Sequence, residues 1–449
     1  MAIAATCVWE VRTTGTQNGG SLFKPGATGT DYSQQDAPQY DITDASAAGA
    51  GLTITTAAAA ADMVGNGLCT VGGTHVTANR WFEITSVVVG TSITVAGAAN
   101  IVSDVGHGDI HVHIGGAFAF GGTNDDQFTE SSTPGNMIYV QSGEYTGVNA
   151  ITTAADGTTA KPITYIGYIT SRTTIPTGTD RPLINMGANA ISIGDCVIFK
   201  YVRFTGTAST LFNNSWMSTV YQCSFEDTSG TANQKAFNFA IGAVSASGMA
   251  EECEFTSTNG IAVNMAYTGH LVHCYIHDSV TGVLTGGTNC FSASIVGCVI
   301  DKCTTAIDLN YNSGSVVNNT LYSGTTGIDM SASAYGWLIA NNIISDFATG
   351  ATCASSILAN VLTNNCWNNT TDIVNLPDDD NGVFDDPLLK APETHDFTLQ
   401  NASPCIDAGS SMSTLVGTVG SYAKNIGAQM AIGGTGGIKI PRGMRGGMN

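Results

Sequence analysis

Leu271-Val-His-Cys274-Tyr-Ile276 and Ile295-Val-Gly-Cys298-Val-Ile300 are two copies of one six-residue pattern. Each copy has an apolar residue, two further residues, a small or polar residue, one more residue, and an apolar residue. Eight copies lie between positions 199 and 367, and their fourth residues are Val202, Cys223, Cys253, Cys274, Cys298, Asn319, Asn342 and Asn365. The differences between successive numbers in this series are 21, 30, 21, 24, 21, 23 and 23. A repeat in the low twenties with alternating apolar residues predicts a solenoid of stacked strands.

A second series of apolar residues runs in step with the first and follows small turn pairs. Its members are Ile261, Val283, Ile307, Ile328, Ala351 and Ile373, whose numbers differ by 22, 24, 21, 23 and 22. Each coil of the solenoid therefore has at least two short strands with inward apolar residues. Because such strands cannot bury a face alone, we expect them to pair with the coils above and below, about 4.8 Å away, around one shared core.

The fourth residues of the pattern form a single predicted file, which begins mainly with cysteines and continues with asparagines. An asparagine at a bend can hydrogen-bond its neighbours along the file, whereas a cysteine acts as a small apolar filler. Over about residues 135–410 this pattern resembles the right-handed parallel β-helix proteins of the pectate-lyase-like superfamily. The resemblance implies an all-β, right-handed parallel β-helix. It implies no particular activity, because this fold hosts unrelated functions.

Charge and composition exclude several functions. The 449-residue chain has a formal net charge of −20 and a pI of about 4.4, which argues against general binding to nucleic acid or anionic membranes. No apolar run approaches the roughly 18 residues of a membrane span. The N-terminus shows no basic leader, so we expect assembly in a reducing cytoplasm with the 12 cysteines mostly as free thiols. The redox state of the stacked Cys223, Cys253, Cys274 and Cys298 stays open.

The sequence predicts three regions. Residues 1–130 form an irregular β-rich cap or attachment region, in which residues 80–95 are expected to make either a hairpin or a step between two adjacent strands. Residues 131–410 form the β-helix, and residues 386–409 resemble a terminal coil that would close the end of its core. The segments Trp9-Glu-Val-Arg12 and Asp31-Tyr-Ser-Gln-Gln-Asp36 resemble the opening of β-helix proteins encoded by tailed phages. That resemblance implies a virion protein.

The last region, residues 411–449, is a Gly- and Met-rich, locally basic extension. We expect it to act as an arm on a neighbouring subunit, with Lys439, Arg442 and Arg445 against an acidic surface and Ile440 and Met444 as apolar anchors. The alternative is that the arm folds back on its own column.

Two carboxylates are the candidate catalytic residues. Asp308 and Asp329 are separated by one repeat of the sequence, so they are expected to stack one coil apart and to face outward. Paired carboxylates can cleave glycosidic bonds. The alternative is that aspartates at such bends hydrogen-bond the backbone and have only a structural role. No complete active-site set of polygalacturonases or pectate lyases occurs in order.

Three weak metal-binding patterns are present. His111 and His113 project from one side of a predicted strand, and His273 and His277 lie in one coil with His270 nearby. Asp378 and Asp380 lie in an acidic loop that resembles part of a calcium site. The histidines lack an evident third ligand, and the loop has leucine where a calcium loop carries its glutamate. We therefore expect no metal and no cofactor.

The sequence supports two functional hypotheses. The first is a structural virion protein of a tailed bacteriophage, most simply a capsid decoration or cement protein, assembled in the host cytoplasm and located in the virion. The alternative is a tailspike that binds or depolymerises host surface polysaccharide, in which case the protein is a hydrolase or lyase. The expected partners are the major capsid protein or tail proteins, and a homo-oligomer, with a trimer as the first hypothesis.

Overall fold

A computed structural model describes residues 7–409 and 426–427, apart from residues 17–18, 36–39, 43–45, 49–50, 56–58, 73–80, 96–109, 119–132, 147–149, 153–155, 240–246, 267, 287–291, 311–312, 331–333 and 355–359. In this part the protein is almost wholly β, with short 3₁₀ helices at Ala61–Met63 (η1), Gly178–Asp180 (η2) and Pro392–Thr394 (η3). None of these described helices is long and apolar enough to cross a membrane. The predicted all-β fold is confirmed.

The chain divides into two compact units. The first comprises Met1–Pro176, Asp180–Asn185 and Ile193–Val202, and the second comprises Thr177–Thr179, Met186–Ser192 and Arg203–Asn449. Each unit is described below by itself.

The first unit contains a seven-stranded antiparallel sheet. Its strands are β3 (Tyr40–Ile42), β4 (Ser46–Ala48), β5 (Gly51–Thr55), β6 (Gly67–Gly72), β7 (Trp81–Val88), β8 (Ser92–Val95) and β9 (Ile110–Ile114). They follow the order β3-β9-β6-β7-β8-β5-β4 across the sheet. Leu68, Phe82, Ile93 and Val112 belong to its buried core. The predicted hairpin at residues 80–95 is confirmed, because β7 and β8 pair antiparallel.

The first unit also contains parallel coils. Its remaining strands are β1 (Val8–Val11), β2 (Leu22–Phe23), β10 (Met137–Gln141), β11 (Glu144–Tyr145), β12 (Ile151–Thr152), β13 (Ile163–Tyr168), β14 (Leu183–Asn185) and β16 (Val197–Lys200). Parallel pairing places Trp9, Ile138, Tyr165 and Phe199 in one register, and all four side chains are buried. The N-terminal strand β1 therefore starts the apolar file one coil before β10.

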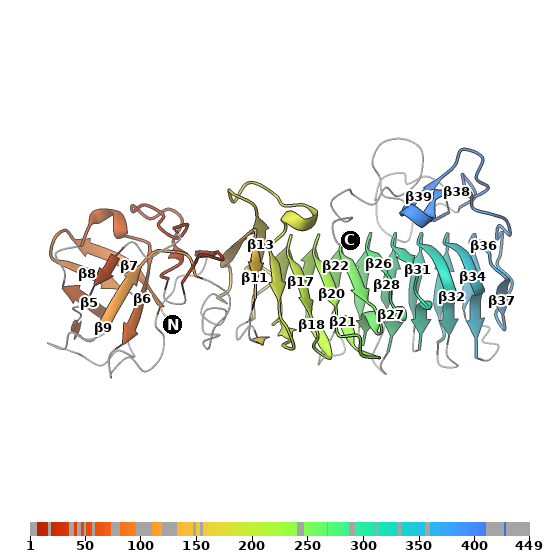
Figure 1. Cartoon of the computed structure of the whole chain (residues 1–449), viewed down its shortest axis with the longest axis horizontal. Helices are drawn as coiled ribbons and strands as arrows, with labels where there is room; N and C mark the ends of the chain where they lie inside the picture. Colours follow the sequence, from red (N-terminus) through yellow and green to blue (C-terminus); the bar gives the residue numbers. More distant parts are fainter. Residues whose placement is uncertain are drawn as a thin grey trace. The chain divides into compact units, whose positions relative to one another are not determined.

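The second unit is a parallel β-helix, as predicted. Its strands are β15 (Ile191–Ser192), β17 (Arg203–Gly206), β18 (Thr210–Asn214), β19 (Thr219–Tyr221), β20 (Ser224–Asp227), β21 (Lys235–Phe239), β22 (Gly248–Glu251), β23 (Glu254–Ser257), β24 (Ile261–Met265), β25 (Gly269–Val272), β26 (Tyr275–His277), β27 (Thr281–Thr285), β28 (Ala293–Val296), β29 (Val299–Asp301), β30 (Thr305–Leu309), β31 (Gly314–Val317), β32 (Thr320–Met330), β33 (Trp337–Ala340), β34 (Ile343–Cys353), β35 (Val361–Thr363), β36 (Cys366–Asn368) and β37 (Thr371–Val374). Most coils contribute three strands, such as β25, β26 and β27, and β32 and β34 run continuously through two of the three positions. Figure 1 shows these strands side by side as successive rungs.

One tight bend recurs in the second unit, immediately before the predicted file of cysteines and asparagines. The residue in the bend has a φ between 49° and 64° in seven coils: Gln222, Glu252, His273, Gly297, Asn318, Asn341 and Asn364. Glycine and asparagine adopt this left-handed conformation most readily. The bend turns the chain so that the following residue points into the core.

The file itself is buried and hydrogen-bonded from coil to coil. The backbone N–H of Asn319 donates to Oδ1 of Asn342 at 2.9 Å, and the N–H of Asn342 donates to Oδ1 of Asn365 at 2.9 Å. Each amide nitrogen also donates to a carbonyl of the preceding coil, as Asn319 does to Ile295. The cysteines follow the same geometry, since Cys274 Sγ donates to the Ala250 carbonyl at 3.3 Å. They are therefore weak hydrogen-bond donors as well as apolar fillers.

The second predicted series was wrong at its first member. The strand register aligns Val263, Val283, Ile307, Ile328, Ala351 and Ile373. Ile261 pairs with Thr281 instead. The spacing of 22 residues from Ile261 to Val283 resembled the repeat. The true register partner of Val283 is Val263, so this coil is two residues shorter than that spacing implied.

The hydrogen-bonded file of cysteines and asparagines, called the ladder below, ends at the buried carboxylate of Asp379. Asp379 Oδ2 accepts hydrogen bonds from the backbone N–H of Asn365 at 3.1 Å, from Asn365 Nδ2 at 2.8 Å and from Trp367 Nε1 at 2.7 Å. The neighbouring residues Asp380 and Val383 make bridges to Thr363 and Cys366. The acidic loop thus continues the pairing of the last coil and supplies its missing acceptors.

The C-terminal segment does not close the end of the core, contrary to the sequence-based prediction. Residues 385–409, called the C-terminal segment below, include the antiparallel strands β38 (Leu389–Ala391) and β39 (Asp396–Leu399). Leu389, Phe397 and Cys405 pack with Val299 and Ile343, which lie on the outer side of the β-helix sheet. Figure 1 shows β38 and β39 against the flank of the rungs. The segment covers a lateral face because that face is apolar.

We predict that the Asp379→Ala substitution destabilises the last coils. Three buried donors would lose their shared acceptor, and each unsatisfied donor costs about 1–3 kcal/mol. Urea unfolding should show a loss of a few kcal/mol. Asp379→Asn should cost less because it keeps one acceptor oxygen. The control is Asp380→Ala, since that side chain is exposed. Equal stabilities of Asp379→Ala and Asp380→Ala would contradict the proposed role of Asp379.

Candidate functional site

The main cluster of ionisable side chains in the second unit lies on the outer face of three neighbouring strands. Register places Glu254 beside Tyr275, and His277 beside Asp301. These residues alternate with Phe255, Ile276 and Ile300, which point into the core. The alternation of a β-strand therefore directs the whole polar set to one face. We call Glu254, Tyr275, His277, Asp278, Asp301 and His395 the histidine–carboxylate cluster.

His277 is held between two carboxylates. Its Nε2 lies 3.1 Å from Glu254 Oε1, and its Nδ1 lies 2.8 Å from Asp278 Oδ2. Its ring stacks on Tyr275 with 4.2 Å between the ring centroids. Burial lowers the pKa of His277, but the hydrogen bonds to Asp278 and Glu254 outweigh burial and raise it to about 9. His277 is therefore a buried cation at neutral pH.

Asp301 is fully buried in the same cluster. Its Oδ2 lies 3.1 Å from His395 Nδ1, and the Tyr275 hydroxyl lies 2.6 Å from that nitrogen. Burial raises the pKa of Asp301 to about 7, against the lowering effect of nearby Lys302 and His277. His395 is the one member contributed by the C-terminal segment, where it ends η3 with a φ of 62°.

The cluster therefore fastens the C-terminal segment to the β-helix. His395 inserts between Tyr275 and Asp301. The Tyr322 hydroxyl donates to Glu393 at 3.1 Å, and Asn364 Nδ2 donates to the Ala408 carbonyl at 3.2 Å. Tyr275, His277 and Asp301 are all at most 5% exposed. Chemically, the cluster can exchange protons and change its charge near neutral pH, but the segment covers it.

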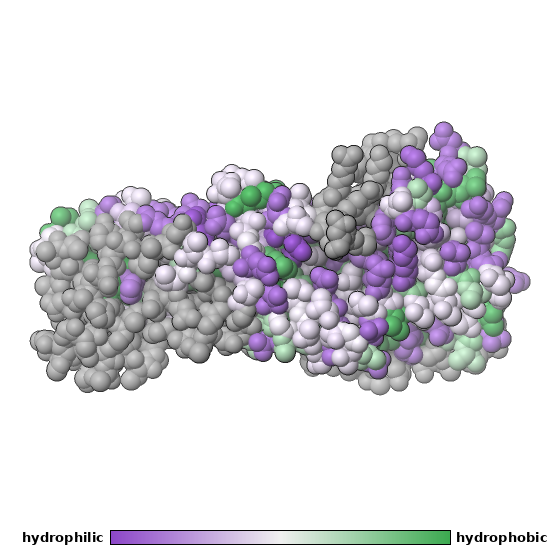
Figure 2. Space-filling model, viewed as in Figure 1, coloured by the Kyte–Doolittle hydropathy of each residue, from purple (hydrophilic) through white to green (hydrophobic). Residues whose placement is uncertain are grey.

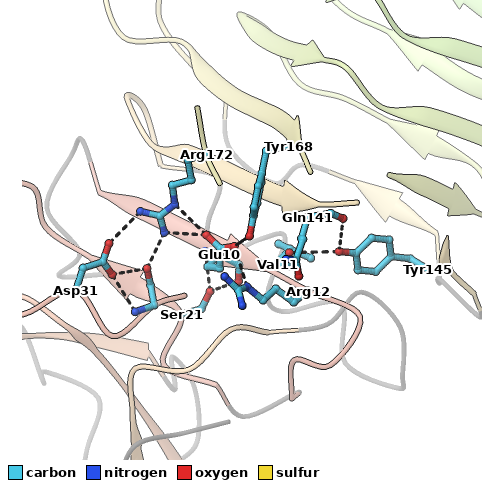
Figure 3. Close-up of polar contacts among 10 residues, drawn as sticks. Glu10, Val11, Arg12, Ser21, Asp31, Gln141, Tyr145, Tyr168 and Arg172 are labelled. Atoms are coloured by element: carbon cyan, nitrogen blue, oxygen red, sulfur yellow. Dashed lines mark hydrogen bonds and ion pairs between the residues drawn. The ribbon is translucent and has the colours of Figure 1, made fainter. Parts of the chain in front are cut away.

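A second ionic cluster lies within the first unit and joins three stretches of chain (Figure 3). The Arg172 guanidinium donates to Glu10 Oε2 at 2.8 and 3.0 Å, to Asp31 Oδ2 at 2.9 Å and to Ser33 Oγ at 2.8 Å. Tyr168 donates a hydrogen bond to the other Glu10 oxygen, Oε1, and Arg12 Nε lies 3.2 Å from that oxygen. The fork geometry of arginine suits such a bidentate contact.

Glu10 is the centre of this second cluster. Its side chain is fully buried, and burial raises its pKa, whereas Arg172 and Tyr168 lower it. Arg172 also lies over the ring of Tyr139, 4.9 Å from its centroid. Removing either charge would leave the other buried and poorly neutralised, which is strongly destabilising. The cluster thus fixes β1 and residues 31–33 onto β13 and the turn after it.

The candidate catalytic pair is assembled as predicted. Asp308 and Asp329 are register partners on β30 and β32, and both side chains are half-buried. Burial raises the pKa of Asp308, and the nearby Asp329 raises it further. The same outer file contains Asn213, Asn238 and Asn264, whose amides form a hydrogen-bonded ladder with distances of 2.9 and 2.7 Å. Leu284 lies between Asn264 and Asp308 in this file, so the asparagine ladder and the aspartate pair are two separate polar groups.

The other candidates do not come together. His113 is half-buried on β9 beside Cys69 in register, and the side chain of His111 lies outside the described residues. Asp378 and Asp380 are exposed, while their neighbour Asp379 serves the ladder. In the part of the chain that the structure describes, no three histidine, cysteine, aspartate or glutamate residues are arranged to hold a metal ion. Lys439, Ile440, Arg442, Met444 and Arg445 lie outside the described residues.

Sequence reasoning missed the residues that link distant segments. Arg172 and His395 carry no repeat signal, and their partners are 162 and 94 residues away. A usable signal existed for the segment that covers Asp301, because Val299 on the same strand and Ile343 on β34 are apolar residues at outward positions. An apolar outer face implies a covering segment. No such inference was available for Arg172.

Several solved structures are similar to this chain at low identity. No family model and no curated protein matches the chain. Among solved structures, pectate lyase Pel9A is similar with a TM-score of 0.43 at 12% identity, covering 70% of this chain and 91% of that protein. A family 6 polysaccharide lyase from Pseudopedobacter saltans has a TM-score of 0.38 at 12% identity, covering 59% and 78%.

A rhamnogalacturonan lyase is similar with a TM-score of 0.34 at 13% identity, covering 56% of this chain and 80% of that protein. All three comparison proteins are polysaccharide lyases. The chain has a parallel β-helix fold, as the superfamily resemblance predicted. Similarity at this level concerns the fold alone and does not extend to activity.

We predict that the C-terminal segment loosens as the pH rises. Burial raises the pKa of Asp301 in the folded protein from its ordinary value of 3.8 to about 7, so its favourable contribution falls as the pH rises from 3.8 to 7. His277 has a folded pKa of about 9 against 6.5, so its contribution is complete below 6.5 and is lost through 9. Proteolysis within residues 385–409 should therefore be faster at pH 9.5 than at pH 6.

Asp301→Asn is the matched variant, because it keeps the shape and hydrogen bonds of the neutral carboxyl without its titration. Between pH 4 and 7, the melting temperature of this variant should depend less on pH than the melting temperature of the wild type. Asp380→Asn, at an exposed position outside the cluster, is the control. A wild-type and an Asp301→Asn profile that run parallel over this range would refute the assignment.

Proposed function

We propose that this chain is a structural protein of the virion of a tailed bacteriophage, namely a capsid decoration or cement protein. The observation that carries the proposal is the cluster around Arg172. The two segments that resemble phage β-helix proteins, residues 9–12 and 31–36, supply Glu10, Asp31 and Ser33, and all three contact Arg172. The resemblance therefore falls on residues that perform one shared structural task.

The contacts of the buried carboxyl groups also support a structural role. Glu10, Asp301 and Asp379 are buried carboxyls with raised pKa values. Each of them joins separate stretches of chain. On the face shown in Figure 2, described apolar residues form small separate patches among hydrophilic ones. A solenoid with fastened segments suits a rigid component that binds the shell through other parts of the chain.

The test is the copy number of the chain in purified virions. Quantitative mass spectrometry should give a ratio to the major capsid protein near one or a simple fraction of it. Crosslinking of the intact virion should join this chain to the major capsid protein and to further copies of itself. A ratio of a few per cent would place it in the tail, and absence from virions would refute both phage assignments.

A tailspike function is the second candidate, and the Asp308–Asp329 pair favours it. A carboxyl with a raised pKa next to a second carboxyl is the arrangement of a general acid with its partner in glycoside hydrolysis. The pair lies on the outer sheet face, which is the side of the coil that an extended polymer can approach. We infer that, if the protein cleaves host surface polysaccharide, Asp308 and Asp329 are the residues to test.

A polysaccharide-cleaving function predicts that Asp308→Asn and Asp329→Asn each lower the rate of reducing-end release by about 10²–10⁴-fold. The exposed bend residue Asp346 offers a matched control as Asp346→Asn, which should keep the wild-type rate. Melting temperatures would show that the variants are folded. If all three variants release reducing ends at equal rates, Asp308 and Asp329 are not the catalytic residues.

A further inference from the structure

Cys366 differs in its environment from the cysteines of the ladder. It follows Asn365 on β36, so its side chain points to the outer face, in register with Ile343 and Thr320. It belongs to the apolar cluster under the C-terminal segment, which supplies Cys405. Both thiols are fully buried and in no disulfide, they belong to one packed cluster, and Cys366 Sγ lies 3.4 Å from the carbonyl oxygen of Asp385, where the segment begins. Two thiols therefore meet across the boundary between the β-helix and the segment.

We propose that Cys366 and Cys405 form a disulfide when the protein enters an oxidising environment, and that this bond fixes the C-terminal segment permanently to the β-helix. The reduced contact depends on groups that titrate, namely His395 with Asp301 and Tyr275, together with Glu254, His277, Asp278 and Lys302 around them. A disulfide has no proton to gain or lose, so it does not change its charge with pH. It would make the attachment independent of pH, and this inference does not depend on the proposed function.

The reaction is thiol–disulfide exchange with a small disulfide such as oxidised glutathione. One cysteine thiolate attacks a glutathione sulfur, which releases one reduced glutathione and leaves a mixed disulfide. The second thiolate attacks the cysteine sulfur of that mixed disulfide and releases the second reduced glutathione. Two thiol protons leave, two electrons pass from the cysteines, and one oxidised glutathione becomes two reduced molecules.

Access to the pair comes from the segment side. Ile406 and Asp407 are exposed next to Cys405, so a small opening of the segment uncovers the thiols. The neighbouring Cys405 thiol and burial raise the pKa of the Cys366 thiol, which makes the closed form slow to react. Oxidation is therefore expected to be faster under mildly alkaline conditions, where the segment also loosens.

The close pair Cys274 and Cys298 serves as an internal comparison. Both lie inside the core file, and the Cys274 backbone N–H donates to Cys298 Sγ at 3.4 Å. A disulfide there would remove hydrogen bonds of the ladder, such as that from Cys274 Sγ to the Ala250 carbonyl. No segment boundary opens at this pair, so it should stay reduced in the folded protein.

The experiment treats the folded full-length chain with oxidised glutathione at about pH 8.5, where a useful fraction of a thiol is ionised. Thiol titration should show the loss of two of the 12 thiols, and peptide mapping should link the peptides of Cys366 and Cys405. Cys405→Ser and Cys366→Ser should each prevent the crosslink. Cys303→Ser, which removes another buried thiol, should leave it unchanged.

The consequence is measured on the same samples. At pH 9.5 the reduced chain should lose the C-terminal segment to protease, whereas the oxidised chain should retain it several-fold longer. Addition of a reducing agent should restore the fast cleavage. A crosslink between other cysteines, glutathionylation without a crosslink, or equal cleavage of the two forms would overturn the proposal.

Discussion

The coils of the second unit depend on one bend and on the side chain that follows it. The bend residue adopts a left-handed conformation, and the next residue turns inward and satisfies the backbone of the neighbouring coil. Without that side chain, buried N–H groups at each bend would lack acceptors. The strands on either side could then still pair, but unsatisfied N–H groups at every bend would lower the stability of the folded chain. The ladder thus makes a short, three-stranded coil a stable repeating unit.

The same requirement explains how the structure ends. A repeat that receives its acceptors from the next coil leaves the last coil unsatisfied, and Asp379 supplies the missing acceptor for Asn365 and Trp367. The outer sheet face has a different need, because Val299 and Ile343 are apolar there. The C-terminal segment covers them and is held by His395. In the first unit, Arg172 performs the corresponding task for the N-terminal segments.

The sequence predicted what repeats and missed what does not. The ladder and the pairing of Asp308 with Asp329 both follow from a nearly constant repeat length, since register is inherited from coil to coil. Ile261 was misplaced because turn length varies, and a shift of two residues preserves the inward direction. The contacts of Arg172 and His395 are single events between distant segments. No local pattern encodes them, so only the structure revealed the two clusters and the outward position of Cys366.

The most direct test of this account is amide hydrogen exchange on the native protein, resolved to single residues. The backbone N–H groups of Cys298, Asn319 and Asn342 donate to asparagine side chains of the following coil. The account predicts that they exchange as slowly as amides within the strands, although they lie at bends. Exchange of these three amides at the rate of exposed turns would show that the ladder does not hold the coils together.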